Sequence, residues 1–138
     1  MKGRDVRRFW VVLSGSWCTC MLAILLFPHA AITEAGPAAN AGNGKVLFEK
    51  RCTGCHSLEK NKEGPRLRDV FGRKAGSVPD FSYSDELKAS KITWDAQSLD
   101  RWLLDPDAVV PNNDMAFHVS NMQERTDIIE FLRVSSGK

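Results

Sequence analysis

The stretch Cys52-Thr53-Gly54-Cys55-His56 decides the fold of this 138-residue chain. Two cysteines separated by two residues and followed directly by a histidine form a haem attachment pattern. The two thiols add across the two vinyl groups of a haem, and the adjacent histidine lies where a ring nitrogen can reach the iron. A covalently held haem would occupy the middle of a small domain and replace much of its core.

Three other interpretations of this pentapeptide are open. A zinc site needs four ligands, and outside the first 35 residues the candidates are Cys52, Cys55, His56 and His118. Structural zinc sites usually separate the cysteine pair from the histidines by about a dozen residues or more, whereas His56 abuts Cys55. A thioredoxin-type pair requires a βαβ context that the flanking sequence does not show. Chance is the third, and the haem site is favoured over all of them.

The first 35 residues differ in character from the rest of the chain. Basic residues in positions 1–8 precede a nearly continuous apolar run over residues 9–27, which is the order of a signal peptide. Thr33-Glu34-Ala35 fits the small-x-small rule, so we predict a signal peptide over residues 1–35. Residues 36–43 are then a flexible lead-in, and residues 44–138 form one domain. The alternative is an uncleaved N-terminal anchor, because 19 residues just suffice to span a bilayer.

The charge balance excludes nucleic acid as a partner. The net charge of +2 belongs to the leader, because residues 40–138 carry fifteen basic and fifteen acidic side chains. Nucleic-acid binding needs a basic face, which a neutral domain does not predict. Attraction to a partner must therefore depend on local charges around the site.

Apolar spacing predicts helices and no strand, so we expect an all-α domain. The expected helices cover residues 44–55, 85–89, about 93–104 and 123–134, and a short turn runs to residue 110. Thr93 or Asp95 can cap the third helix. One face of that helix is apolar, with Leu99, Trp102 and Leu103. In the last helix we expect Ile128, Ile129, Phe131 and Leu132 to face inward, and Glu124, Arg125, Glu130 and Arg133 to face outward.

Two axial ligands are expected on the iron, and His56 is the first. Pro65 follows nine residues later, and its carbonyl is the natural acceptor for the second ring nitrogen of His56, which would fix the tautomer. For the other ligand the candidates are Met115, Met122 and His118. Met115 is favoured because it lies in a loop, and His118 could replace it if that loop shifted. An iron with both axial positions filled can only exchange single electrons.

The chain from Gly44 to Leu132 resembles the class I cytochromes c, close to mitochondrial cytochrome c and its small soluble bacterial relatives. The matching stretches keep their order along the chain: Cys52-Thr-Gly-Cys-His56, Gly64-Pro-Arg-Leu67, Phe71-Gly-Arg-Lys-Ala-Gly76, Phe81-Ser-Tyr-Ser84, Ile92-Thr-Trp94 and residues 111–117. The resemblance implies a monomer with three main helices and short turns wrapped around one covalently attached haem c.

The resemblance also implies roles for side chains away from the iron. Packing of the first helix on the last is implied for Gly44 and Phe48 against Ile128 and Phe131. Hydrogen bonds to the inner haem propionate are implied for Tyr83 and Trp94, with Arg73 as the charge partner.

Departures from the family pattern fall around the methionine. Trp102 stands where the family often has a tyrosine whose hydroxyl reaches the methionine sulfur, and an indole N–H can also donate. The usual Pro-Gly-Thr-Lys-Met is Pro-Asn-Asn-Asp-Met here. Asn113 replaces the threonine and is expected to reach a propionate. Asp114 replaces a lysine on the rim where redox partners of this family dock.

These observations predict a periplasmic one-electron carrier that works between redox complexes, with quinol–cytochrome c reductase and a terminal oxidase as candidate partners. A retained leader would anchor it to the inner membrane. The alternative function is a haem peroxidase or ligand sensor, in which Met115 is labile and His118 or an open site takes over.

Overall fold

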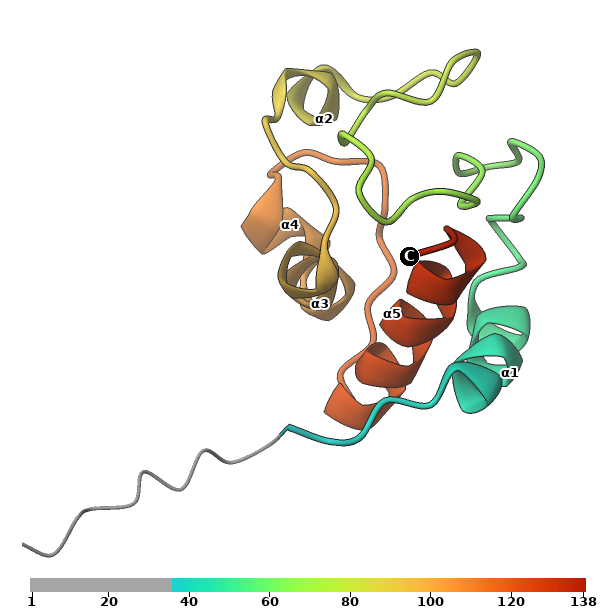
Figure 1. The fold of residues 1–138 in the computed structure, drawn as a ribbon. Coiled ribbons are helices and arrows are strands. Elements are labelled where there is room, and N and C mark those ends of the chain that lie inside the picture. The colour runs from blue at the N-terminus through green and yellow to red at the C-terminus, as the bar shows by residue number, and fades with distance from the viewer. Residues whose placement is uncertain (1–35) are drawn as a thin grey trace, which may run out of the picture. The chain divides into compact units, whose positions relative to one another are not determined.

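The computed structural model describes residues 36–138, which contain five helices joined by long loops (Figure 1). The predicted leader and its cleavage site lie outside the described residues. The helices are α1 (Ala41–Arg51), α2 (Asp85–Ala89), α3 (Ala96–Leu104), α4 (Pro106–Val109) and α5 (Met122–Ser135). Within this range the only strand-like pairing is an isolated bridge between Lys74 and Thr93, so the expectation of an all-α domain is confirmed. None of these helices has the length and apolar character needed to cross a membrane.

Helix α1 begins earlier and ends earlier than the predicted helix over residues 44–55. It begins after Asn40, whose side chain accepts a hydrogen bond from the backbone N–H of Asn43 at 3.0 Å and so caps the first turn. Residues 41–43, which we expected in the lead-in, therefore form that turn. The helix ends at Arg51, and in the turn that follows the backbone N–H groups of Cys55 and His56 donate to the carbonyl of Cys52 at 3.1 and 2.8 Å.

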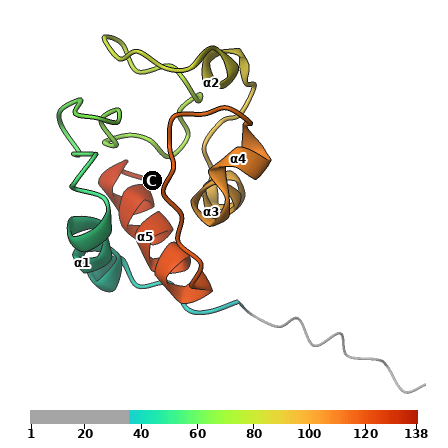
Figure 2. The same cartoon turned by 180° about the vertical axis from the view of Figure 1, so that it is seen from behind.

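Helices α1 and α5 pack side by side, as both views of the fold show (Figures 1 and 2). Gly44 allows this contact, because a Cβ built on it would lie 1.9 Å from the carbonyl oxygen of Asp127. The rings of Phe48 and Phe131 pack with their centroids 5.2 Å apart, and Ile128 is fully buried beside them. The packing that the resemblance implied is therefore present.

A buried carboxylate fastens the start of α1 to α5. Asp127 accepts hydrogen bonds from the backbone N–H of Asn40 at 2.9 Å, from Asn43 Nδ2 at 2.5 Å and from Gln123 Nε2 at 2.9 Å. Burial by itself raises the pKa of Asp127, but these three donors outweigh it and hold the pKa below its ordinary value. The carboxylate therefore stabilises the fold above its unfolded pKa, and this contribution is lost as the pH falls through the lowered folded pKa.

The middle helices follow the sequence signals closely. Helix α2 covers the predicted residues, and α3 is capped by Asp95, whose carboxylate accepts from the Ser98 backbone at 2.7 Å in a capping box. The predicted face of α3 is buried, including Trp102 and Leu103. Helix α4 replaces the predicted turn, with Asp105 as its cap and Pro106 at its first position.

Arg125 corrects one prediction for the last helix. We expected it to face outward, but only 4% of it is exposed. Its guanidinium donates to Asp100 on α3 at 2.7 Å and to the carbonyls of Val119 and Ser120. Helical spacing could not predict this, because the carbonyls that bury the side chain belong to the incoming loop.

We predict that Gly44→Ala destabilises the haem-loaded protein by about 3 kcal/mol, because the added methyl group overlaps the rigid backbone of α5. Denaturant unfolding of the holoprotein measures the loss. Gly42→Ala is the matched control in the same helix, where the nearest atom is the Asn40 side chain at 3.3 Å. Its unfolding free energy should change by less than about 1 kcal/mol. Equal losses in the two variants would contradict close packing at Gly44.

Candidate functional site

A cavity of about 260 Å³ lies among α1, α3, α5 and the loops that connect the helices. Its walls are mainly apolar, with Phe48 from α1, Leu99 and Leu103 from α3, and Ile128 and Leu132 from α5. The side chains predicted for the site all line this one cavity, although they come from distant parts of the chain: Cys52, Cys55, His56, Pro65, Arg73, Tyr83, Trp94, Trp102, Asn113 and Met115.

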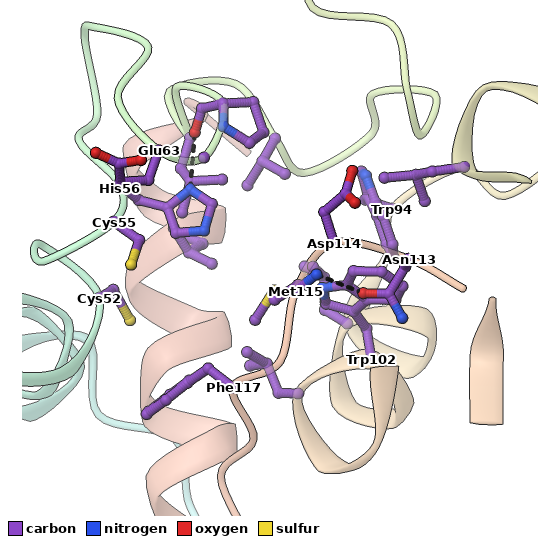
Figure 3. Close-up of a pocket in the computed structure, with 18 of the residues that line it drawn as sticks. Cys52, Cys55, His56, Glu63, Trp94, Trp102, Asn113, Asp114, Met115 and Phe117 are labelled. Atoms are coloured by element: carbon purple, nitrogen blue, oxygen red, sulfur yellow. Dashed lines mark hydrogen bonds between the residues drawn. The ribbon is translucent and has the colours of Figure 1, made fainter. Parts of the chain in front are cut away.

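The two cysteines lie at one edge of the cavity, in the turn that follows α1. Both are free thiols, and their sulfur atoms point toward the cavity (Figure 3). Cys52 is half-buried and Cys55 is exposed. Burial raises the pKa of Cys52 to about 11, so its thiol is uncharged at neutral pH and suits an apolar wall.

His56 is held in one tautomer by a single hydrogen bond. Its Nδ1 lies 2.8 Å from the carbonyl oxygen of Pro65, as the sequence predicted, and a carbonyl can only accept, so Nδ1 carries the proton. Nε2 is left with a free lone pair. Burial lowers the pKa of His56 and outweighs the Pro65 hydrogen bond, which raises it. The neutral imidazole is the form that binds metals.

Gly64 contributes to the site in a way that sequence reasoning missed. A Cβ at this position would lie 2.2 Å from Cε1 and 2.6 Å from Nδ1 of His56, so the ring packs directly on the glycine backbone. The signal was present in the sequence, since Gly64 precedes the proline that binds the histidine. We assigned a role to Pro65 alone, because only the folded chain shows which residue the ring touches.

Met115 lies across the cavity from His56, in the loop between α4 and α5 (Figure 3). Its backbone N–H donates to Asn113 Oδ1 at 2.7 Å, and its sulfur accepts a hydrogen bond from Trp102 Nε1 at 3.1 Å. The loop methionine is therefore held at its backbone and at its sulfur. The geometry of the indole donor, which the sequence alone left open, is that of a sulfur hydrogen bond.

The other candidate ligands lie elsewhere. Met122 is the first residue of α5 and is 59% exposed. His118 lines a second cavity at the surface with Asp105 and Asp107, and Met115 and Ala116 line both cavities. His118 itself does not line the cavity that holds His56. Among residues 36–138 no three His, Cys, Asp or Glu side chains are grouped so that they could hold a metal ion. The four ligands considered for zinc are therefore not brought together.

Polar side chains gather at one part of the cavity wall. The Arg73 guanidinium donates to the carbonyls of Arg66 at 2.9 Å and Arg68 at 2.8 Å. Burial lowers the pKa of Arg73 and raises that of Tyr83, and the Arg73 charge opposes the rise for Tyr83. Trp94 is buried, and its ring packs against the ring of Trp102 with the two ring centroids 5.3 Å apart. A cation and a phenol donor are thus available to an anionic group.

The side-chain amide of Asn113 already has hydrogen-bond partners in the loop and in α4. Its Nδ2 donates to Asp107 Oδ1 at 2.9 Å and to the carbonyl of Val110 at 3.0 Å, while its Oδ1 accepts from Met115. Both amide hydrogens are used, so a propionate contact would require one of these bonds to be exchanged. The predicted propionate contact of Asn113 stays a prediction.

The rim of the cavity includes residues that we did not assign from the sequence. Cys55 and Asp114 were assigned a role from the sequence, and the other exposed members of the rim are Arg51, Glu63, Ala116 and Phe117. Arg51 pairs with Glu124 at 2.8 Å, and Phe117 is 40% exposed although it is a large aromatic side chain. The sequence feature that could have pointed to Phe117 is a large apolar side chain two residues after the predicted ligand Met115.

The residues of this cavity fit a haem. Two free thiols at one edge match the two vinyl groups, and the apolar walls match a flat macrocycle. A neutral imidazole and a thioether face each other across the space and offer the nitrogen and sulfur that haem iron accepts. This donor set distinguishes the cavity from a general apolar pocket.

Comparison with known proteins agrees with this geometry. A sequence profile described as Cytochrome c matches residues 41–136. Cytochrome c2 of Rhodomicrobium vannielii is 41% identical over 116 residues, which cover 79% of this chain and 92% of that protein. Cytochrome c of Euglena viridis is 40% identical and covers 68% of this chain and 95% of its own length. The solved structure of cytochrome cH from Methylobacterium extorquens superposes with a TM-score of 0.67 at 40% identity, covering 70% of this chain and 99% of that one.

We predict that Gly64→Ala displaces the His56 ring from Pro65 and weakens its hold on the iron. The expected result is a lower yield of holoprotein, a partly high-spin ferric spectrum, and a loss of about 2 kcal/mol in unfolding free energy. Gly54→Ala is the control, because no atom lies within 4 Å of a Cβ there although the residue sits between the two cysteines. An unchanged low-spin spectrum in Gly64→Ala would contradict the role assigned to this contact.

Proposed function

Because the chain belongs to the cytochrome c family and is an electron carrier with a covalently attached haem c, we propose that His56 Nε2 and Met115 Sδ are the two axial ligands of its iron. When bound, the haem supplies an iron that takes up and releases one electron. The observation that carries the proposal is the position of these two side chains on facing walls of one cavity, each oriented by a hydrogen bond.

In the proposed site, the two side chains keep other ligands away from the iron. If His56 and Met115 both held the iron, small molecules such as dioxygen would find no free position on it. A thioether is a soft, neutral ligand that favours ferrous iron, so the pair favours a high potential. His118 does not line the cavity that holds His56, which favours the carrier over a peroxidase or sensor with His118 at the iron.

We assign the polar part of the wall to the buried propionate. Arg73 supplies a positive charge that two backbone carbonyls hold in place, and Tyr83 supplies a hydroxyl whose raised pKa keeps it a donor. Trp94 supplies a third contact from its buried position. Cys52 and Cys55 would hold the haem by thioether bonds from the turn that follows α1.

A redox titration followed by visible absorbance tests the ligand pair. We expect a one-electron transition, a far-red iron–thioether band in the ferric protein, and no immediate uptake of carbon monoxide by the reduced protein. Met115→Ala should lose the band and bind carbon monoxide at once, whereas His118→Ala, from the second cavity, should behave as the native protein. Immediate uptake by the native protein would exclude the closed iron.

For partners we propose larger redox complexes, with quinol–cytochrome c reductase and a terminal oxidase as candidates, and a monomeric carrier in the periplasm. Asp114 is an exposed residue on the rim, where it places a negative charge beside the cavity, and we propose that electrons leave there. The leader supports export, and N-terminal sequencing of protein from its native host would show whether it is removed; a start at Met1 would indicate a retained anchor.

We predict that Asp114→Lys raises the rate of oxidation by ferricyanide and lowers the rate with a cationic cobalt complex. The reversed charge lies on the rim, and both effects should shrink as salt screens it. Glu86→Lys on α2 is the matched control, since it makes the same charge change at an exposed residue that does not line the cavity. Equal rate changes in the two variants would show that electrons do not leave beside Asp114.

A further inference from the structure

The Lys62 ammonium donates to the carbonyl oxygens of Thr53 and Gly54, the two residues between the cysteines of the attachment turn. The contact to Gly54 is 3.2 Å long. We infer that Lys62 is a positioning residue, which holds the attachment turn in place and, through its fixed positive charge, raises the reduction potential of the haem. This inference rests on the proposed function in one respect, the assignment of His56 as an axial ligand.

The attachment turn needs a donor from outside because it follows the last turn of α1, where backbone carbonyls lose their helical partners. The carbonyl of Cys52 accepts from two backbone N–H groups that follow it, and the carbonyl of Cys55 accepts from the backbone of the next loop. Within residues 36–138, no backbone donor reaches the carbonyls of Thr53 and Gly54. Lys62 therefore supplies the missing hydrogen bonds, as a lysine can at the C-terminal end of a helix.

The backbone around Lys62 is fixed, so its ammonium is held at this turn. The backbone N–H of Lys62 donates to the carbonyl of Gly64 at 2.9 Å, and the N–H of Gly64 donates to the carbonyl of Cys55 at 2.8 Å. Gly64 in turn packs on the ring of His56. The segment over residues 62–65 thus folds over the attachment turn and places the positive charge on the histidine side of the cavity.

The charge of Lys62 is not cancelled by a carboxylate. Both of its acceptors are neutral carbonyls, and none of the ion pairs within residues 36–138 includes it. Burial is the main cause of the lowered pKa of His56, the Pro65 hydrogen bond opposes it, and the Lys62 charge lowers that pKa further.

A fixed positive charge on this side of the site raises the potential. Ferric iron carries one more positive charge than ferrous iron, so a nearby cation destabilises the ferric form more. Lys62 is an exposed residue, and water and salt screen part of this effect. The expected change on removing the charge is therefore modest and should shrink as the salt concentration rises.

Removing the charge while keeping the donor separates the two roles of Lys62. Site-specific incorporation of Nε-acetyllysine at position 62 removes the charge and keeps one N–H on Nζ, whereas Lys62→Met removes both. In both proteins the equilibrium constant for reduction of the ferric haem by ferrocyanide should fall about threefold, which is about 28 mV at 59 mV for each tenfold change. The unfolding equilibrium constant of the holoprotein should rise about tenfold in Lys62→Met and less in the acetylated protein.

Two control variants show whether the position of the charge matters. Lys60→Met removes the same charge from the same loop, at an exposed residue whose side chain makes no hydrogen bond or ion pair within residues 36–138. Its equilibrium constant should change by less than about 1.5-fold, and Lys62→Arg, which keeps both the charge and the donors, should stay near the native value.

Three results would overturn the inference. A native potential in Lys62→Met would show that Lys62 does not act on the haem. Equal falls in Lys60→Met and Lys62→Met would show that the potential follows net charge and not the held ammonium. A native potential in the acetylated protein would overturn the role of the charge.

The same measurements distinguish this inference from the proposed function. If native protein lacks the far-red band or takes up carbon monoxide at once, Met115 is not a ligand and the proposed pair fails, while the comparison of Lys60 and Lys62 still reports on the histidine side. If the native iron is closed and the variants of Lys62 match those of Lys60, the ligand pair stands and only the role of Lys62 is withdrawn.

Discussion

The hydrogen bond from His56 Nδ1 to the Pro65 carbonyl is the constraint on which the rest of the site depends. It fixes the tautomer, so that Nε2 is free, and it sets the ring against Gly64, where no side chain could fit. Burial keeps the ring neutral. The ring next to Cys55 in sequence thereby presents Nε2 in a fixed direction, and in the proposed site the opposite wall of the cavity supplies the second ligand.

That opposite wall is built on the packing of α1 against α5 and of α3 against α5. Close approach at Gly44 and the Asp127 carboxylate hold the first pair, while Arg125 ties the second pair to the loop that carries Met115. The loop has little regular structure of its own, so its position depends on such side-chain hydrogen bonds. Stability of the helices and geometry of the iron site are therefore coupled.

The methionine loop differs most from the family pattern, and it shows how a loop can keep its geometry with other residues. Asn113 accepts from the backbone of Met115 and donates to Asp107 and Val110, which ties the loop to the end of α4. Trp102 supplies the donor to sulfur where the family often has a tyrosine. Asp114 changes the charge of the rim, whereas the hydrogen bonds that hold the loop are made by Asn113 and Trp102.

The sequence by itself predicted the haem, the all-α fold and His56, Pro65 and Met115, because C-x-x-C-H, Gly-Pro and helical spacing are local patterns with local causes. The roles of Arg73, Tyr83 and Trp94 were predicted only through the resemblance to the family. It also predicted Pro65 as the acceptor for His56, since nine residues are enough for the chain to turn back. Three results required the tertiary structure: the burial of Arg125, the contact of Gly64 with the ring, and the bond from Trp102 to Met115. Each depends on the distance between segments that local patterns do not place, and a hydrogen bond is decided by a few tenths of an ångström.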